Sequence, residues 1–198
     1  MGKIIKDALV LFAITTVAGL LLAIVNEVTK APIEAQQIKA REEACRNVFE
    51  DAASFVENEE IIKNTAIIEA FGTKYPKVSI VNVYKAFDSS NNELGYVVTL
   101  STKEGYGDNI TFSMGIRNDR TLNGVAILSS NETVGLGLEA ENVLVPQFKN
   151  KNVPSFTYTK TGSTNDSEID AISSATITTN AFVNAVNAGL DFYDLYLE

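Results

Sequence analysis

The sequence predicts an α+β protein, in which an antiparallel sheet with flanking helices is joined to a single N-terminal transmembrane helix. Three observations predict this class. Residues 8–25 form a charge-free apolar run, about the length that a membrane-crossing helix needs. Segments rich in β-branched residues alternate with turn-forming residues between 78 and 129. Apolar residues then recur at helical spacing over residues 178–196.

The apolar run is interpreted as a retained membrane anchor, and residues 1–30 are assigned to it. A cleaved signal peptide and a buried core helix are the alternatives. A signal peptide would carry small residues at a cleavage site after the run, and the residues after Ala23 do not fit. A core helix would normally have a polar face, which Thr15 and Thr16 alone do not supply.

The charges beside the anchor leave its orientation open. Lys3 and Lys6 precede the apolar run, whereas Lys30, Lys39 and Arg41 follow it. Positive residues tend to stay on the cytoplasmic side, so these two groups favour opposite orientations.

Residues 31–76 are polar and helix-prone, and we predict a helical stalk and connector there. Pro32 suits the first turn of a helix. A second, shorter apolar-periodic piece covers residues 61–71.

Residues 77–198 are expected to form the folded domain. An antiparallel meander is predicted, with strands over 78–84, 95–100, 110–116 and 125–129. A short helix over 138–148 should end near Pro146, and 155–159 is a further candidate strand. The last helix is predicted over 178–196.

The composition excludes several kinds of site. Histidine is absent and Cys45 is the one cysteine, which excludes His-based catalysis, a His zinc site and an intrachain disulfide. The net charge is −9, and no Lys/Arg cluster offers a patch for nucleic acid. We therefore expect no nucleic-acid partner, no metal ligands and no catalytic residues of the chain's own.

Three loops carry candidate site motifs, of which the first two contain glycine and the third combines an acidic residue with hydroxyl residues. They are Gly105-Tyr106-Gly107, Glu132-Thr133-Val134-Gly135-Leu136-Gly137 and Asp170-Ala171-Ile172-Ser173-Ser174-Ala175-Thr176. Glycine lets a backbone approach a ligand closely or adopt positive φ. Taken singly, each motif is more typical of a turn than of a site.

Thr176 places a hydroxyl at the start of the last helical pattern. Free N–H groups and the helix dipole favour an anion such as phosphate at that position. An ordinary helix cap is the alternative interpretation, because Ser and Thr are common at the N-cap.

In this order and behind an N-terminal anchor, the three motifs resemble those of the G subunit of the Rnf ion-translocating oxidoreductase complex. They are similar also to the C subunit of the sodium-translocating NADH:quinone oxidoreductase, which shares the domain. Ser174 stands at the glycine of the family pattern Asp-x-x-(Ser/Thr)-Gly-Ala-(Thr/Ser), and Val134 at the proline of Glu-Thr-Pro-Gly-Leu-Gly. The resemblance covers the whole chain, and the short stalk favours the Rnf protein.

The resemblance implies that residues 77–198 are an FMN-binding domain with covalently attached flavin. The hydroxyl of Thr176 would form a phosphoester with FMN, installed by a separate flavin transferase that uses FAD and Mg²⁺. Asp170, Ser173, Ser174 and Ala175 would be the sequence that the transferase recognises. The flavin ring would lie against Glu132, Thr133, Gly135, Leu136 and Gly137, in a pocket shaped also by Gly105, Tyr106 and Gly107.

The function implied is that of an electron carrier in a ferredoxin:NAD oxidoreductase complex coupled to ion transport. The chain would be a single-pass protein of the cell membrane, partnered by other Rnf membrane subunits, with its FMN domain outside the cytoplasm. Three alternatives are a stand-alone extracytoplasmic flavoprotein carrier, the related quinone-reductase protein, and a membrane-tethered binding module without flavin.

Overall fold

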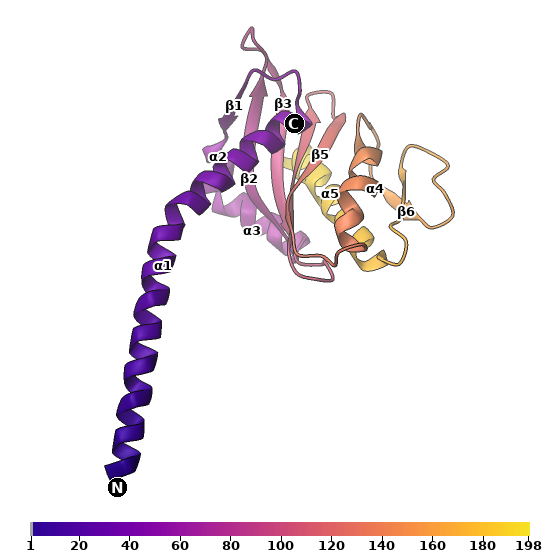
Figure 1. The fold of residues 1–198 in the computed structure, drawn as a ribbon. Helices are drawn as coiled ribbons and strands as arrows, with labels where there is room; N and C mark the ends of the chain where they lie inside the picture. Colours follow the sequence, from indigo (N-terminus) through magenta and orange to yellow (C-terminus); the bar gives the residue numbers. More distant parts are fainter. Residues whose placement is uncertain (1) are drawn as a thin grey trace. The chain divides into compact units, whose positions relative to one another are not determined.

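The computed structural model describes residues 2–198, in two compact units. The first unit ends at Ala40, and the second comprises Arg41–Glu198 (Figure 1). The helices are α1 (Gly2–Val48), α2 (Glu59–Lys63), α3 (Thr65–Lys74), α4 (Ala140–Val143) and α5 (Thr176–Tyr196), with single 3₁₀ turns at Gly137–Glu139 and Val145–Phe148. The strands are β1 (Ser54–Glu57), β2 (Val78–Phe87), β3 (Glu93–Thr102), β4 (Ile110–Arg117), β5 (Leu122–Ser130), β6 (Thr157–Thr159) and β7 (Glu168–Asp170).

Helix α1 contains the predicted anchor and, by length and composition, is able to cross a membrane. The structure differs from the sequence prediction at Pro32, which lies inside α1 rather than at the start of a separate helix. A proline inside a helix removes one main-chain hydrogen bond. Here the residues on both sides favour helix and no turn-forming pair accompanies the proline, so the helix continues to Val48.

Residues 31–76 also differ from the predicted helical stalk, because they contain strand β1. Its four residues pair antiparallel with β2, with Ser54 opposite Phe87 and Glu57 opposite Tyr84. A strand this short carries too few residues for a period-two pattern to be recognised in the sequence. It is its pairing with β2 that defines it.

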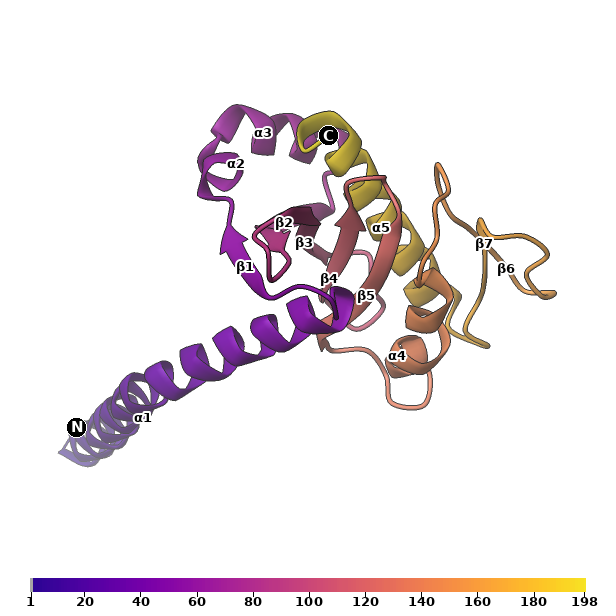
Figure 2. The ribbon, with the colours of Figure 1, turned by 90° about the horizontal axis from the view of Figure 1, so that it is seen from above.

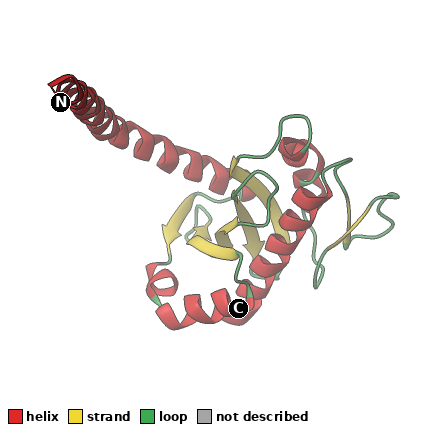
Figure 3. Ribbon diagram, turned by 90° about the horizontal axis from the view of Figure 1, so that it is seen from below, coloured by secondary structure: helices red, strands yellow, loops and turns green. Residues whose placement is uncertain are grey.

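The predicted antiparallel meander is confirmed. Five strands follow one another in the order β1-β2-β3-β4-β5, and every neighbouring pair is antiparallel. Helix α5 runs along this sheet in Figure 2 and makes contacts with β3 and β4. The α+β class predicted from the sequence is therefore the observed one, with helices and strands as separate segments of the chain (Figure 3).

The two faces of the sheet carry separate apolar clusters. Alternation along β3 sends Tyr96 and Val98 into the larger cluster, which includes the buried side of α5. Val97, between them, joins a smaller cluster with Cys45 and Phe49 at the end of α1. The thiol of Cys45 is buried there, and burial raises its pKa to about 11.

Two glycines allow the helices to approach the sheet closely. A Cβ on Gly189 of α5 would overlap the sulfur of Met114 in β4. A Cβ on Gly115 would lie 2.9 Å from the carbonyl oxygen of Val48 and 3.0 Å from the ring of Phe49. β4 is therefore in close contact with α5 at Met114 and with residues 48–49 at Gly115.

The segment between β5 and α5 is less regular than predicted. The helix expected over 138–148 is α4 flanked by two 3₁₀ turns. The strand expected over 155–159 is β6, which pairs in parallel with β7, a strand the sequence did not predict. Strand β7 ends at Asp170, so it leads directly into the third motif and the start of α5.

Candidate functional site

A cavity of about 490 Å³ lies where the three motifs meet the start of α5. Its volume is within the range typical of small-molecule sites, roughly 300–1,000 Å³. The lining residues are Tyr106, Glu132, Thr133, Leu136, Gly137, Ser174, Ala175, Thr176, Ile177 and Thr178. Loops that are distant in sequence thus contribute to one cavity.

The start of α5 leaves its first amide groups open. Ala175 is the N-cap residue, and no side chain caps the helix there. The amide of Thr179 donates to the carbonyl of Ala175 at 3.0 Å, so the amides of residues 176–178 precede the first intrahelical bond. Open amides at the positive end of a helix favour an anion. Because the N-cap is Ala175 and not a serine or threonine, the interpretation of the hydroxyl cluster as an ordinary cap is wrong.

The hydroxyls of this cluster are not equivalent. Thr178 is 2% exposed and donates to Glu132 at 2.9 Å. Thr179 is fully buried, donates to the carbonyl of Ala175 and accepts from the amide of Ile172. Thr176 is partly exposed and lines the cavity, and no hydrogen bond to its hydroxyl occurs within residues 2–198. Thr176 is therefore the threonine of this cluster whose hydroxyl is both accessible and unengaged.

Ser174 has a backbone conformation that favours glycine. Its φ is +62°, in the left-handed region, and its side chain is exposed at the cavity. A residue with a Cβ is strained in that region. The glycine of the family pattern at this position thus has a physical reason, and Ser174 keeps the turn at some cost.

Glu132, in the second motif, contacts both the first motif and the start of α5. It is only 6% exposed, and both carboxylate oxygens accept hydrogen bonds. Oε2 accepts from the hydroxyl of Thr178 at 2.9 Å, and Oε1 accepts from the amide of Gly107 at 3.3 Å. One buried side chain thereby joins the second motif to the first motif and to the first turn of α5.

The glycines make room for that carboxylate. A Cβ on Gly105 would lie 2.5 Å from Oε1 of Glu132, and one on Gly137 would lie 2.5 Å from Oε2. A Cβ on Gly107 would overlap the carbonyl of Asn131. Gly137 lines the cavity, whereas Gly105 and Gly107 lie behind it, against Glu132 and its neighbour. They shape the cavity indirectly, through the carboxylate.

The second motif begins with a tight turn. The amide of Leu136 donates to the carbonyl of Thr133 at 3.1 Å, and Gly135 has φ +74° at the third position. A type II turn requires positive φ there and favours proline at its second position. Val134 occupies that second position and is 82% exposed. Gly135 itself does not line the cavity.

Asp170 and Ser173 of the third motif also lie outside the cavity wall, as Gly105, Gly107 and Gly135 do. Asp170 ends β7, where its carboxylate accepts from the amide of Ser163 at 2.5 Å and its amide donates to Gln147 at 2.7 Å. Ser173 is exposed beside the wall. Conversely, the sequence prediction missed Ile177 and Thr178, which line the cavity from the first turn of α5. Their place in that turn, directly after Thr176, is the signal that could have found them.

A family comparison gives the class of protein to which this fold and site belong, the flavin-binding domains. Residues 105–191 match the family described as FMN-binding domain, a range that contains all the lining residues. Residues 1–48, a range that contains α1, match the family described as RnfG N-terminal region.

The relatives identify the family more closely. The G subunit of the Na⁺-translocating ferredoxin:NAD⁺ oxidoreductase complex of Acetobacterium woodii is 33% identical, covering 96% of this chain and 91% of that one. The G subunit of the ion-translocating oxidoreductase complex of Methanosarcina acetivorans is 29% identical, covering 96% and 94%. The chain belongs to the RnfG family, as its motifs predicted.

A solved structure confirms the fold. The crystal structure of Shewanella oneidensis NqrC aligns with a TM-score of 0.51 at 17% identity, covering 75% of this chain and 84% of that one. An α+β domain with an antiparallel sheet was the predicted class, and this likeness agrees with it.

The residues present fit an FMN group. Tyr106, Leu136 and Ile177 give the cavity apolar and aromatic walls, which suit a flat ring. The unengaged hydroxyl of Thr176 and the open amides of α5 suit the phosphate end. These features are at the same cavity, so ring and phosphate can be held together.

Proposed function

We propose that this chain is an electron-carrier subunit of an Rnf-type ion-translocating oxidoreductase complex, with FMN held at the start of α5. The observation that carries the proposal is the convergence of all three motifs on one cavity with an unengaged threonine hydroxyl. Relatives that are G subunits of such complexes, aligned over nearly the whole chain, support membership of a complex of this kind.

The FMN is attached covalently through Thr176 in this proposal. A flavin transferase that uses FAD and Mg²⁺ would form a bond between the threonine Oγ and the FMN phosphorus. The pyrophosphate bond of FAD breaks, AMP leaves, and the hydroxyl proton is released. Ser173 and Ser174 of the recognition sequence are exposed, so another protein can reach them, whereas Asp170 is partly exposed and Ala175 is buried.

The chain's own residues hold and orient the cofactor. The bound flavin supplies one-electron chemistry, which the side chains do not need to assist. Tyr106, Leu136 and Ile177 would offer apolar and aromatic surface to the ring. The amides at the start of α5 would stabilise the charge of the phosphodiester. Glu132 fixes the relative positions of the loops through Gly107 and Thr178.

The domain lies outside the cytoplasm in this proposal, on a single membrane-spanning segment within α1. A covalent link suits that location, because FMN lost there could not be replaced from the cytoplasmic pool. Protease added to intact spheroplasts should then cleave the domain, and cleavage only after the membrane is broken would contradict this orientation.

Membership of the complex has its own test. The chain, carrying an affinity tag after Glu198, should co-purify from mild detergent with several polytopic membrane proteins. Purification of the flavinylated chain alone, under conditions that keep such complexes intact, would instead favour a stand-alone carrier.

The cofactor proposal is tested by flavin fluorescence on a denaturing gel. Wild type, Thr176→Ala and Thr176→Ser are each co-expressed with a flavin transferase. Fluorescence should appear in wild type, disappear with Ala and be retained at least in part with Ser, because serine keeps a hydroxyl at the same position.

Two results would contradict the proposal. Fluorescence that persists in Thr176→Ala would move the attachment to another hydroxyl, with Ser174 next because it also lines the cavity. No fluorescence in any variant, with a known flavinylated protein labelled in parallel, would remove covalent flavin altogether.

A further inference from the structure

We infer that Glu132 makes this cavity repel a free phosphate dianion, so that the unmodified chain admits a flavin ring but binds free FMN poorly. The inference rests on the proposed function, since it takes the cavity to be the flavin site. It adds a role for one residue: Glu132 discriminates between flavins by charge, and the cofactor is retained by its ester rather than by affinity for its phosphate.

The charges around the cavity carry the first step. Of the lining residues, Glu132 is the one with a charged side chain, and neither lysine nor arginine is among them in the described chain. Protein sites that bind free phosphate usually supply a cation, often an arginine with two parallel donors. Here the open amides of α5 are the positive groups on the wall.

Glu132 lies close to the positive end of α5, where a phosphate would also bind. Its Oε2 accepts from the hydroxyl of Thr178, the third residue of α5. The carboxylate thus already lies at the positive end of the helix, where it takes up part of the favourable potential. A phosphate entering the same cavity meets a helix end that is partly neutralised and a buried negative charge nearby.

The charge of the ligand carries the third step. A phosphate monoester carries about −1.5 to −2 charges at pH 7, whereas a phosphodiester carries about one. Esterification at Thr176 therefore removes much of the repulsion that free FMN would experience. Riboflavin, which has the same ring and no phosphate, experiences none. The cavity is consequently better suited to a transferred flavin than to one arriving by diffusion.

The test uses the full chain, produced without a flavin transferase and purified in nonionic detergent micelles. Riboflavin and FMN are titrated separately and followed by flavin fluorescence, with empty micelles as the blank. We expect riboflavin to bind about tenfold more tightly than FMN. Added salt should narrow this ratio, because it screens the repulsion of FMN and leaves riboflavin unaffected.

Two variants separate charge from structure. In Glu132→Gln, the amide oxygen can accept from Gly107 and the amide nitrogen can donate to the Thr178 hydroxyl, so both contacts remain possible without the charge. The ratio of the two dissociation constants should fall to within about twofold of unity in Glu132→Gln. Thr178→Val removes one contact to Glu132 but keeps the carboxylate, and its ratio should stay near that of wild type.

The outcomes distinguish the inference from the proposed function. Riboflavin that binds tightly beside weak FMN, with the difference lost in Glu132→Gln, supports the inference. Equal binding of both flavins by wild type overturns the inference and leaves the flavin site intact. The same conclusion follows if the ratio of the two dissociation constants is unchanged in Glu132→Gln, or if it falls to near unity in Thr178→Val. If wild type binds neither flavin while remaining folded by circular dichroism, the inference fails and the non-covalent basis of the flavin site fails with it.

Discussion

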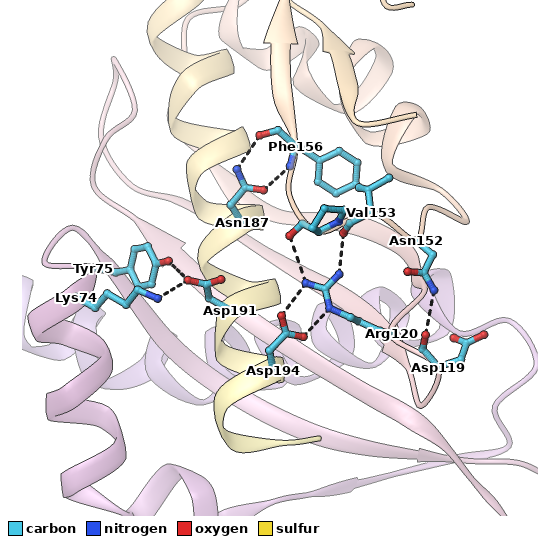
Figure 4. A network of polar contacts seen from close by, with 11 residues as sticks. Lys74, Tyr75, Asp119, Arg120, Asn152, Val153, Phe156, Asn187, Asp191 and Asp194 are labelled. Carbon is cyan, nitrogen blue, oxygen red and sulfur yellow. Dashed lines mark hydrogen bonds and ion pairs between the residues drawn. The ribbon is translucent and has the colours of Figure 1, made fainter. Parts of the chain in front are cut away.

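The two ends of α5 are built in opposite ways. At its start, the Thr176 hydroxyl and the first amides have been left open at a cavity. Toward its end, each charged side chain is paired: Asp194 with Arg120 at 2.7 Å, and Asp191 with Lys74 at 2.6 Å (Figure 4). Four residues before Asp191, the side chain of Asn187 accepts from the amide of Phe156 and donates to its carbonyl (Figure 4).

The difference teaches how a helix can offer an open end. A helix start without a side-chain cap forgoes about 1 kcal/mol of stabilisation. The paired groups farther along α5 tie the helix to α3, to the turn between β4 and β5, and to the segment before β6. Contacts made away from the cavity therefore hold the helix, and the residues at the cavity remain available to a ligand.

The largest effect is expected from a substitution behind the cavity, near the start of α5. Gly107→Ala would force a Cβ into the carbonyl of Asn131, a backbone atom that cannot swing aside. We expect a loss of about 3 kcal/mol in the free energy of unfolding, measured by denaturant unfolding of the full chain in detergent. Gly72→Ala, in helix α3 with open space at its Cβ, is the matched control and should instead stabilise by about 0.5–1 kcal/mol. Equal effects of the two would contradict the packing behind Glu132.

The next largest effect is expected from removing the ion pair that holds the end of α5. Arg120 contacts both oxygens of Asp194 at 2.7 Å and the carbonyls of Val153 and Pro154. Arg120→Met should lower the free energy of unfolding by about 2 kcal/mol, because it leaves several polar groups without their partner.

Lys149→Ala is the control for Arg120→Met, since Lys149 pairs with Glu50 at an exposed site. Its cost should stay below about 1 kcal/mol, as is usual for surface pairs. If Arg120→Met remains folded but loses flavin attachment at Thr176, the contacts at the end of α5 also position its start. Unchanged unfolding in Arg120→Met would show that the pairing does not hold the helix.

The long elements of the fold were predictable from sequence, and the short ones were not. Strands β2–β5 and helix α5 extend over enough residues for their periodicity to identify them. Strands β1 and β7 have four and three residues, and each is defined by its partner strand. Pro32 shows a related limit of prediction from local sequence. Its position favours a helix start, but the helix-forming residues around it continue α1 through the proline.

The site was predictable as a set of motifs, but its wall was not. Resemblance to a family brought the three motifs together, whereas the division between wall and support depends on distances. Gly105 and Gly107 are beside Tyr106 in sequence, yet only Tyr106 lines the cavity. The buried position of Glu132 explains this, and no sequence pattern indicates that both glycines pack on a carboxylate or on its neighbour.

A smaller effect on stability is expected from the strained backbone before the start of α5. Ser174 adopts φ +62° just before Ala175, the N-cap of α5. Ser174→Gly should stabilise the chain by about 0.5–1 kcal/mol, because glycine is unstrained there but loses more entropy on folding. Gly135→Ala, at φ +74°, is the mirror-image control and should destabilise by about 1 kcal/mol. Thermal unfolding of both variants against wild type measures the pair, and a destabilised Ser174→Gly would contradict the backbone conformation assigned to this turn.

The smallest effect concerns pH at the paired end. Burial alone would raise the pKa of the Asp191 carboxyl, but hydrogen bonds from Lys74 and Tyr75 outweigh it and hold that pKa below its ordinary value of 3.8. A carboxyl with a lowered folded-state pKa contributes stability above its unfolded value, and this contribution is lost as pH falls through the folded value. The difference in unfolding free energy between wild type and Asp191→Asn should therefore be constant from about pH 6 to about pH 5 and shrink below about pH 4. Paired denaturant titrations across that range measure it, and a difference that does not change with pH would show that the contacts of Asp191 at this end of α5 do not favour its ionised form.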